Sequence, residues 1–262
     1  MPVFRHCAFV RTVAVCLLLF CAVSISARAA VAGPSLEELL KKADAHYSRR
    51  IDPRETDQAF AVLKQADLAY PGTSSVLWRL ARISHWKATR FPKNDKKNRL
   101  EWFEVGKAYA ERATQANPND ADAFYWLAAL IGEIGSARGI LQSLFMVGPM
   151  KQALDQALAI DPNHASAHYV MSELYRQVPG PPISIGNRQK AVAEARLAVK
   201  LAPGDSSHQL SLARALVAVR EYSEARQVFN HILTMPLDPE DPEGTKEDQE
   251  AARQELAAIA GK

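Results

Sequence analysis

The chain has 262 residues, of which 48% are hydrophobic, so it is long enough for one large domain or one repeat array. Its formal net charge is +3, but three of its 32 basic residues and none of its 29 acidic residues lie within positions 1–32. The remaining chain carries 29 basic and 29 acidic residues, and this balance argues against nucleic acid as a partner.

Residues 1–32 have the pattern of a secretory signal peptide. Basic residues come first, and residues 12–23 form an apolar stretch that is too short to span a bilayer. Pairs of small residues two positions apart end at Ala29 and at Ala32, which are the two predicted cleavage sites. We therefore expect an exported, periplasmic protein without a membrane span after cleavage, the alternative being an uncleaved anchor.

All three cysteines, Cys7, Cys16 and Cys21, lie within this segment. The mature chain would therefore contain no disulfide, no thiolate metal site and no cysteine nucleophile, as suits an oxidising compartment. Cys16 follows Val15 and Cys21 follows Phe20, so neither has the small preceding residue of a lipoprotein site. We do not expect a lipid anchor.

The rest of the chain repeats a helical pattern. A small residue is followed by an apolar residue four positions later, by Ala after three more, and by Pro after five more. The first three positions share one helix face, where small side chains let a neighbouring helix come close, and the Pro marks the helix end. Full copies occupy 59–71, 106–118, 150–162 and 191–203, the third with Met150 in place of the small residue, and a shortened copy starts at Ala225.

A second pattern starts six residues after each Pro, at Leu77, Phe124, His168 and Gln209. Its fifth residue is again small, which permits close crossing with a partner helix. Together the two patterns predict helices over residues 36–49, 56–69, 74–90, 100–116, 121–134, 150–160, 165–177, 188–201, 206–219 and 222–234.

A last helix is predicted over residues 246–260. A capping box of Thr245 and Asp248 would start it, after an acidic, proline-rich linker at 236–244. Its apolar residues would cover the open end of a repeat array, namely Ala251, Leu256 and Ile259.

The two patterns together resemble the tetratricopeptide-repeat (TPR) family. The resemblance implies an all-α, right-handed α-solenoid of about five helix pairs over residues 33–237, followed by a linker and capping helix at 238–262. Successive Pro residues of the pattern lie 47, 44 and 41 residues apart, whereas the family period is about 34. The extra residues fall between the two helices of a pair, so we expect them to line one rim of the array.

The three insertions differ in chemistry. Residues 91–98 are polar and basic, and residues 178–186 are rich in Pro and Gly, so both are predicted to be loops. The loop expected at residues 135–149 is apolar, and must form extra core, meet a partner or line a pocket. The apolar side chains concerned are Ile140, Leu141, Leu144, Phe145 and Met146.

Residues 120–205 are also similar to a narrower group. This group comprises the T components of TRAP-type solute transporters and the regulator-of-microtubule-dynamics proteins. The resemblance rests on the insertions, on the run from Ala159 to Pro162 and on the residues from His168 to Tyr175. The transporter resemblance implies a protein that binds a small organic or hydrophobic ligand and docks on a solute-binding protein.

No catalytic constellation or cofactor motif is evident, so we expect no enzyme activity and no cofactor. His164 and His168 have the spacing of zinc ligands on a helix, but no third ligand is evident, so we expect no metal.

Binding residues are expected on the first helix of each pair, which lines the concave groove of a TPR array. These side chains combine aromatic rings with three arginines, which suits peptides, acidic side chains or carboxylate ligands. The alternative is that they are surface residues with intramolecular partners. The groove positions are Trp78, Arg82, His85, Tyr125, Tyr169, Glu173, Arg176 and Arg214.

Two functions follow from these patterns. The first is a non-enzymatic periplasmic scaffold that binds another protein or a peptide, and the second is the transporter accessory with a small organic ligand. An enclosed pocket lined by the apolar insertion would favour the second function, and an insertion packed as core would favour the first. Self-association into a homo-oligomer remains open.

Overall fold

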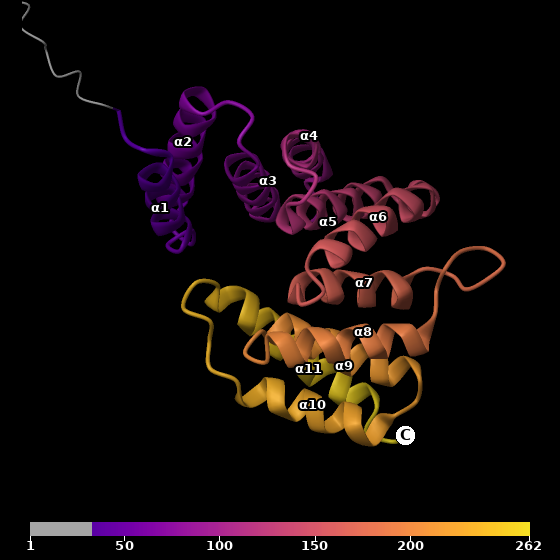
Figure 1. The fold of residues 1–262 in the computed structure, drawn as a ribbon. Helices are drawn as coiled ribbons and strands as arrows, with labels where there is room; N and C mark the ends of the chain where they lie inside the picture. Colours follow the sequence, from indigo (N-terminus) through magenta and orange to yellow (C-terminus); the bar gives the residue numbers. More distant parts are fainter. Residues whose placement is uncertain (1–32) are drawn as a thin grey trace, which may run out of the picture. The chain divides into compact units, whose positions relative to one another are not determined.

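Residues 33–262, apart from the side chain of Ile140, are described by a computed structural model of the chain (Figure 1). Residues 34–262 form one unit of contacting helices. The predicted signal peptide lies outside the described residues.

Eleven helices and no strand occur within residues 33–262, as the sequence patterns predicted. Consecutive helices pack as pairs, from α1 with α2 to α9 with α10, and α11 packs on α9 and α10. The helices are α1 (Leu36–Tyr47), α2 (Pro53–Ala69), α3 (Ser74–Thr89), α4 (Lys96–Ala116), α5 (Ala121–Arg138), α6 (Ile140–Ile160), α7 (Ala165–Gln177), α8 (Arg188–Leu201), α9 (Ser206–Ala218), α10 (Tyr222–Thr234) and α11 (Pro242–Ala258).

The turns between pairs follow from the repeated Pro. For example, α4 ends at Ala116, two residues before Pro118, because Pro cannot continue the helix. Asp120 then caps α5 by accepting a hydrogen bond from the backbone N–H of Ala123. Asp205 caps α9 in the same way, so short, defined turns precede α5 and α9.

Small residues of the pattern lie where helices cross. Gly106 of α4 is buried, and a Cβ atom at this position would lie 3.1 Å from Ser84 Cβ and 3.2 Å from the carbonyl oxygen of Ala81 on α3. Ala110 and Ala113, one and two turns later, are also fully buried. The pattern therefore marks the face on which α4 meets α3.

The apolar insertion is helical, which corrects the prediction of a loop at 135–149. The helix α5 continues to Arg138, and α6 starts at Ile140 rather than at 150. Gly139, with φ of +100°, makes the turn between them. Pro149 lies inside α6, on its exposed side. The helix therefore continues through this position although Pro donates no backbone hydrogen bond.

The start of α11 also differs from the prediction. Asp241 caps the helix by accepting from the backbone N–H of Gly244, and Pro242 occupies the first turn. Thr245 is buried four residues later, and Asp248 accepts instead from the hydroxyl of Ser206 on α9. The predicted capping box does not form because α11 starts at Pro242, so Thr245 lies inside the helix and its hydroxyl bonds to the backbone of Asp238 and Asp241.

The predicted role of α11 as a cap is confirmed. Ile259 is 3% exposed and Ala252 is fully buried, and both belong to the core that continues from α9 and α10. Ala251 and Leu256 pack against the edge of the same core. None of the helices within residues 33–262 is both long and apolar enough to cross a membrane.

Candidate functional site

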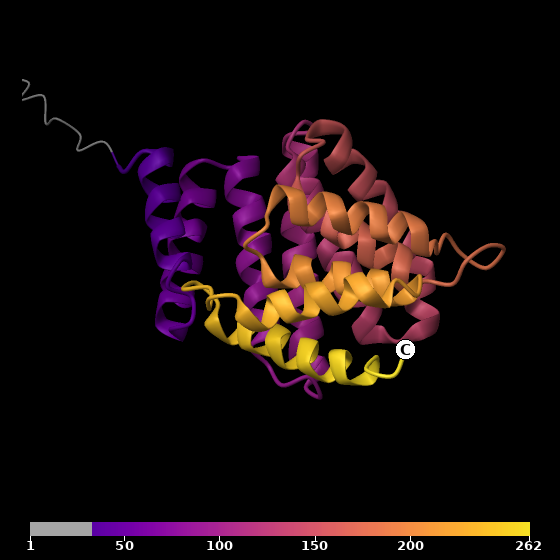
Figure 2. The same cartoon turned by 90° about the horizontal axis from the view of Figure 1, so that it is seen from below.

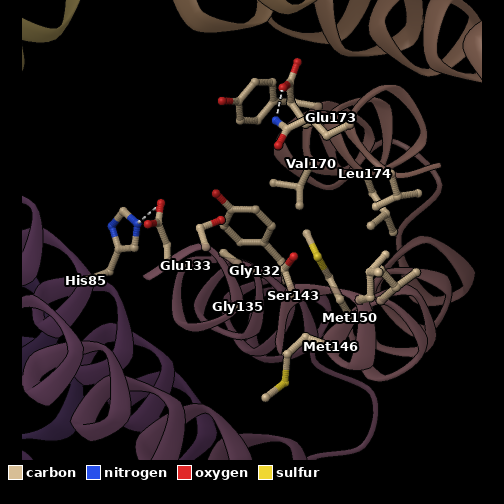
Figure 3. A pocket seen from close by; sticks show the side chains of 18 of the residues that line it. His85, Gly132, Glu133, Gly135, Ser143, Met146, Met150, Val170, Glu173 and Leu174 are labelled. Atoms are coloured by element: carbon tan, nitrogen blue, oxygen red, sulfur yellow. Dashed lines mark hydrogen bonds and ion pairs between the residues drawn. The ribbon is translucent and has the colours of Figure 1, made fainter. Parts of the chain in front are cut away.

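A pocket of about 730 Å³ lies between α3, α5, α6 and α7. Figure 3 shows Met150 and Ser143 of α6 across from Val170 and Glu173 of α7, with His85 and Glu133 at one side. The pocket is therefore lined by α3, α5 and α7, the first helices of three successive pairs, and by α6, which contains the apolar insertion.

The repeat period places equivalent side chains around this pocket. Tyr125 and Glu133 are two turns apart on one face of α5, and both line the pocket. Tyr169 and Glu173 line it from the same face of α7. Gly135 allows α6 to approach this part of α5, because a Cβ atom there would lie 3.2 Å from Ser143 Cα.

Glu133 carries one negative charge at the pocket wall. Burial alone would raise its pKa, but the nearby His85 ring and the charge of Arg99 outweigh burial and lower the pKa. The two partners are at some distance, with His85 Nε2 at 3.7 Å and Arg99 Nη2 at 3.9 Å from the carboxylate. Glu133 is thus ionised at neutral pH, and neither of these partners lies within hydrogen-bond distance of its carboxylate.

Glu173 carries a second negative charge and is held more tightly. It accepts hydrogen bonds from Arg176 Nη2 and Gln177 Nε2, both at 2.6 Å, and from Ser211 Oγ at 2.7 Å. Burial would raise the pKa of Glu173, but these partners and the Arg176 charge lower it. Its carboxylate is therefore fixed and ionised.

Tyr125 and Tyr169 add phenol groups to the same surface. Burial raises the pKa of both tyrosines, so both stay protonated across the physiological range. Each ring packs on a histidine of the next pair, Tyr125 on His164 and Tyr169 on His208, with centroids 4.9 and 5.1 Å apart. The rings are thereby oriented by the stacking of the pairs.

The predicted groove residues divide into two groups. Those that line the pocket are His85, Tyr125, Tyr169 and Glu173. Trp78 and the three arginines do not line it, and each arginine has an intramolecular carboxylate partner: Asp44 for Arg82, Glu173 for Arg176 and Glu255 for Arg214. Their binding roles stay predictions.

The predicted apolar insertion divides in a similar way. Leu144 and Met146 line the pocket, whereas the side chains of Leu141 and Phe145 are 75% and 77% exposed. The side chain of Ile140 is outside the described part of the structure.

Sequence reasoning missed several wall residues, including Trp126, Met150, Val170 and Leu174. Their spacing indicates a helix face but does not distinguish core from the wall of a cavity. Glu133 was missed as well, although its place two turns after Tyr125 was a usable signal.

The histidine pair has structural partners. His164 Nδ1 accepts from the backbone N–H of Ala167 at the start of α7. His168 Nδ1 lies 2.6 Å from Glu194, and its Nε2 lies 3.0 Å from the carbonyl oxygen of Pro162. Within residues 33–262, no group of three or more His, Cys, Asp or Glu side chains is arranged to hold a metal ion.

Comparison with known proteins identifies the family. A family model described as "Regulator of microtubule dynamics protein 1-3" matches residues 39–179, more than half of the chain. The chain belongs to this family. The match confirms the predicted resemblance to the regulator-of-microtubule-dynamics proteins. It covers residues 39–179, whereas the resemblance was expected over residues 120–205. The resemblance to transporter T components stays a prediction.

Two relatives show the extent of the match. Regulator of microtubule dynamics protein 1 of Bos taurus is 28% identical over 136 residues, which cover 52% of this chain and 41% of that protein. Protein 3 of Xenopus laevis is 26% identical over 133 residues, covering 51% of this chain and 28% of that protein. The match thus spans well under half the length of these curated relatives.

The TPR protein TTC0263 of Thermus thermophilus shows the fold. Its structure superposes with a TM-score of 0.59 at 14% sequence identity, covering 86% of this chain and 99% of that chain. The described helices therefore form a TPR array, as predicted.

Proposed function

We propose that this chain is a non-enzymatic interaction scaffold that holds a polypeptide segment in the pocket between α3, α5, α6 and α7. The observation that supports this function is the pocket itself, whose volume of about 730 Å³ would take one or two large side chains of a bound segment. TPR arrays present such surfaces on the first helices of successive pairs, as here.

The charges around the pocket favour a segment with an apolar residue beside a basic one. Glu133 and Glu173 are ionised, and Glu133 has only two distant partners. The arginines that led us to expect an acidic ligand have carboxylate partners within the chain. Glu133 is therefore more available to a lysine or arginine of the segment than these arginines are to a carboxylate.

A peptide library displayed on phage would test this function. We expect selected peptides to share an apolar residue next to Lys or Arg. Their binding should fall at least tenfold in Ala129→Phe, which places a ring in the pocket, and stay unchanged in Ala193→Phe, on the exposed side of α8. Selected peptides that ignore Ala129→Phe would refute the proposal.

A second candidate is a small apolar ligand, which one specific observation favours. Leu144, Met146 and Val147 of the insertion line the pocket, and its volume falls within the range of roughly 300–1,000 Å³ usual for small-molecule sites. Native mass spectrometry of the protein purified from its own cells distinguishes the candidates. A bound species of a few hundred daltons that Ala129→Phe abolishes would support a small ligand over a peptide.

We also infer that the protein is exported and that residues 1–32 are removed. The arrangement of basic, apolar and small residues in this segment supports this, as does the confinement of all three cysteines to it. N-terminal sequencing of the protein from a periplasmic fraction should start at Ala30 or Gly33. An intact N-terminus in the membrane fraction would contradict export with cleavage.

A further inference from the structure

Arg50 lies in a preformed aromatic site at the end of the first helix pair. Its guanidinium carbon is 4.6 Å from the ring centroid of Tyr47 and 4.8 Å from that of Trp86, and its side chain is only 10% exposed. Its backbone carbonyl accepts hydrogen bonds from Trp86 Nε1 at 3.2 Å and from Thr56 Oγ1 at 2.9 Å. Both the backbone and the side chain of Arg50 are therefore held in place.

The carboxylate on Arg50 comes from the other end of the array. Arg50 Nη1 donates to Glu240 Oε2 at 2.8 Å across 190 residues of sequence. Glu240 belongs to residues 236–241, the linker between α10 and α11. Figures 1 and 2 both show this linker beside the turn that joins α1 and α2.

The pairing leaves Arg50 incompletely satisfied. Its Nε atom is buried and has no hydrogen-bond partner among the described residues. Glu240 contacts it through Nη1 alone, which also donates to the carbonyl oxygen of Tyr47 at 3.3 Å, and Glu240 is itself half exposed. A carboxylate that bound two guanidinium nitrogens at once would make a stronger contact than the one that Glu240 makes.

Neighbouring charges add to the attraction for an anion. Arg82 lies 3.8 Å from the same Tyr47 ring, and its Nε is also buried without a partner in the described part of the chain. Arg82 shares the carboxylate of Asp44 with Arg79. Two of the three guanidinium groups are thus paired with Asp44, and the third, that of Arg50, is paired with Glu240.

We propose that Arg50 and its aromatic neighbours form a binding site for acidic peptide segments, which the chain fills with its own linker. The bound linker shows the ligand chemistry, because it is an acidic, proline-rich segment with Asp238, Glu240 and Asp241, of which Glu240 makes the contact. This site is separate from the pocket and takes ligands of the opposite charge. An acidic segment of a partner protein binds by displacing Glu240 from Arg50.

Displacement of the linker by a free peptide can be measured, because the linker is part of the same chain and competes for the site. A linked segment competes at an effective concentration of about a millimolar, so it weakens the binding of a free peptide with a dissociation constant near 100 µM by about tenfold. Removing the Glu240 carboxylate should remove most of this competition without touching the site.

Fluorescence anisotropy of a labelled, end-capped peptide of residues 236–242 provides the test. We expect Glu240→Ala to bind this peptide about tenfold more tightly than the wild-type chain does. Glu243→Ala is the matched control, because Glu243 lies next to the same linker but pairs only with Lys246, three residues on in α11. That variant should bind like the wild type.

A change in the peptide avoids any effect of a protein variant on folding. The same peptide with Gln at the position of Glu240 should lose its affinity for the Glu240→Ala chain. Arg50→Gln in that chain should abolish binding as well, with circular dichroism as the check on folding. Equal affinity of wild type and Glu240→Ala, or equal affinity of the Glu and Gln peptides, would overturn the proposal.

Discussion

His168 shows at the scale of a single residue how a substitution within the repeat can be stabilised. It occupies a position that is usually bulky and apolar, and it is buried. Its two ring nitrogens face two acceptors, the carboxylate of Glu194 and the carbonyl oxygen of Pro162. Only the doubly protonated ring can donate to both, so the site favours the imidazolium form.

The charge of His168 makes stability depend on pH. The hydrogen bond to Glu194 raises its pKa, with a smaller contribution from Pro162, and outweighs burial, which alone would lower it. Because the folded pKa lies above the unfolded value of about 6.5, this contribution is complete below pH 6.5 and is lost as the pH rises through the folded pKa.

Urea unfolding of wild type and Glu194→Gln at pH 5.5 and pH 9 measures this contribution. The variant should be less stable than the wild type by about 1.5 kcal/mol at pH 5.5, and the difference should shrink at pH 9. Every other side chain is the same in the two proteins, so the comparison isolates the pair of His168 and Glu194. A difference that grows with pH would contradict this account.

At the scale of helices, the small residues of the pattern set the distance between neighbours. Gly106 illustrates this, since the nearest atoms to a Cβ at its position include a backbone oxygen of α3 that cannot move away without moving the helix. A side chain of any size there must separate α4 from α3.

Gly106→Leu should therefore lower the free energy of unfolding by roughly 2 kcal/mol, the usual cost of overpacking. Ala108→Leu is the control, because it places the same good helix former on the exposed side of α4. It should change stability by less than about 0.5 kcal/mol. Similar losses in the two variants, measured by thermal unfolding, would show that close helix crossing is not the cause.

At the scale of the whole molecule, each helix pair packs mainly on the pairs before and after it. The core is accordingly a series of clusters, one over α1 to α3 and a larger one that runs from α5 to α11. The cap α11 closes the second of these through Ile259. Loss of packing at one end of the array should consequently lower the stability of the helices near that end.

Ile259→Ala tests this nearest-neighbour behaviour. We expect a loss of about 2 kcal/mol in local stability from the cavity and the lost burial. Hydrogen exchange followed by mass spectrometry should show faster exchange in α9 to α11 and unchanged exchange in α2 to α4. A uniform increase along the chain would indicate that the array unfolds as one cooperative unit instead.

The sequence by itself determined most of the helices, their pairing and the capping role of α11, because helix faces, small crossing residues and Pro are local features with a fixed period. It also predicted four of the groove residues that line the pocket, since Tyr125 and Tyr169 occupy equivalent places in the repeat.

Only the tertiary structure decided how these features are used. Pro149 appeared to end a loop but lies inside α6, and of the apolar residues before it Val147 is buried, whereas Leu141 and Phe145 are exposed. Two arginines of the predicted groove, Arg82 and Arg214, are paired with Asp44 and Glu255, which lie 38 and 41 residues away in the sequence and so beyond any local spacing. The contact between Arg50 and Glu240 joins opposite ends of the array, and its distance in sequence places it beyond any local pattern.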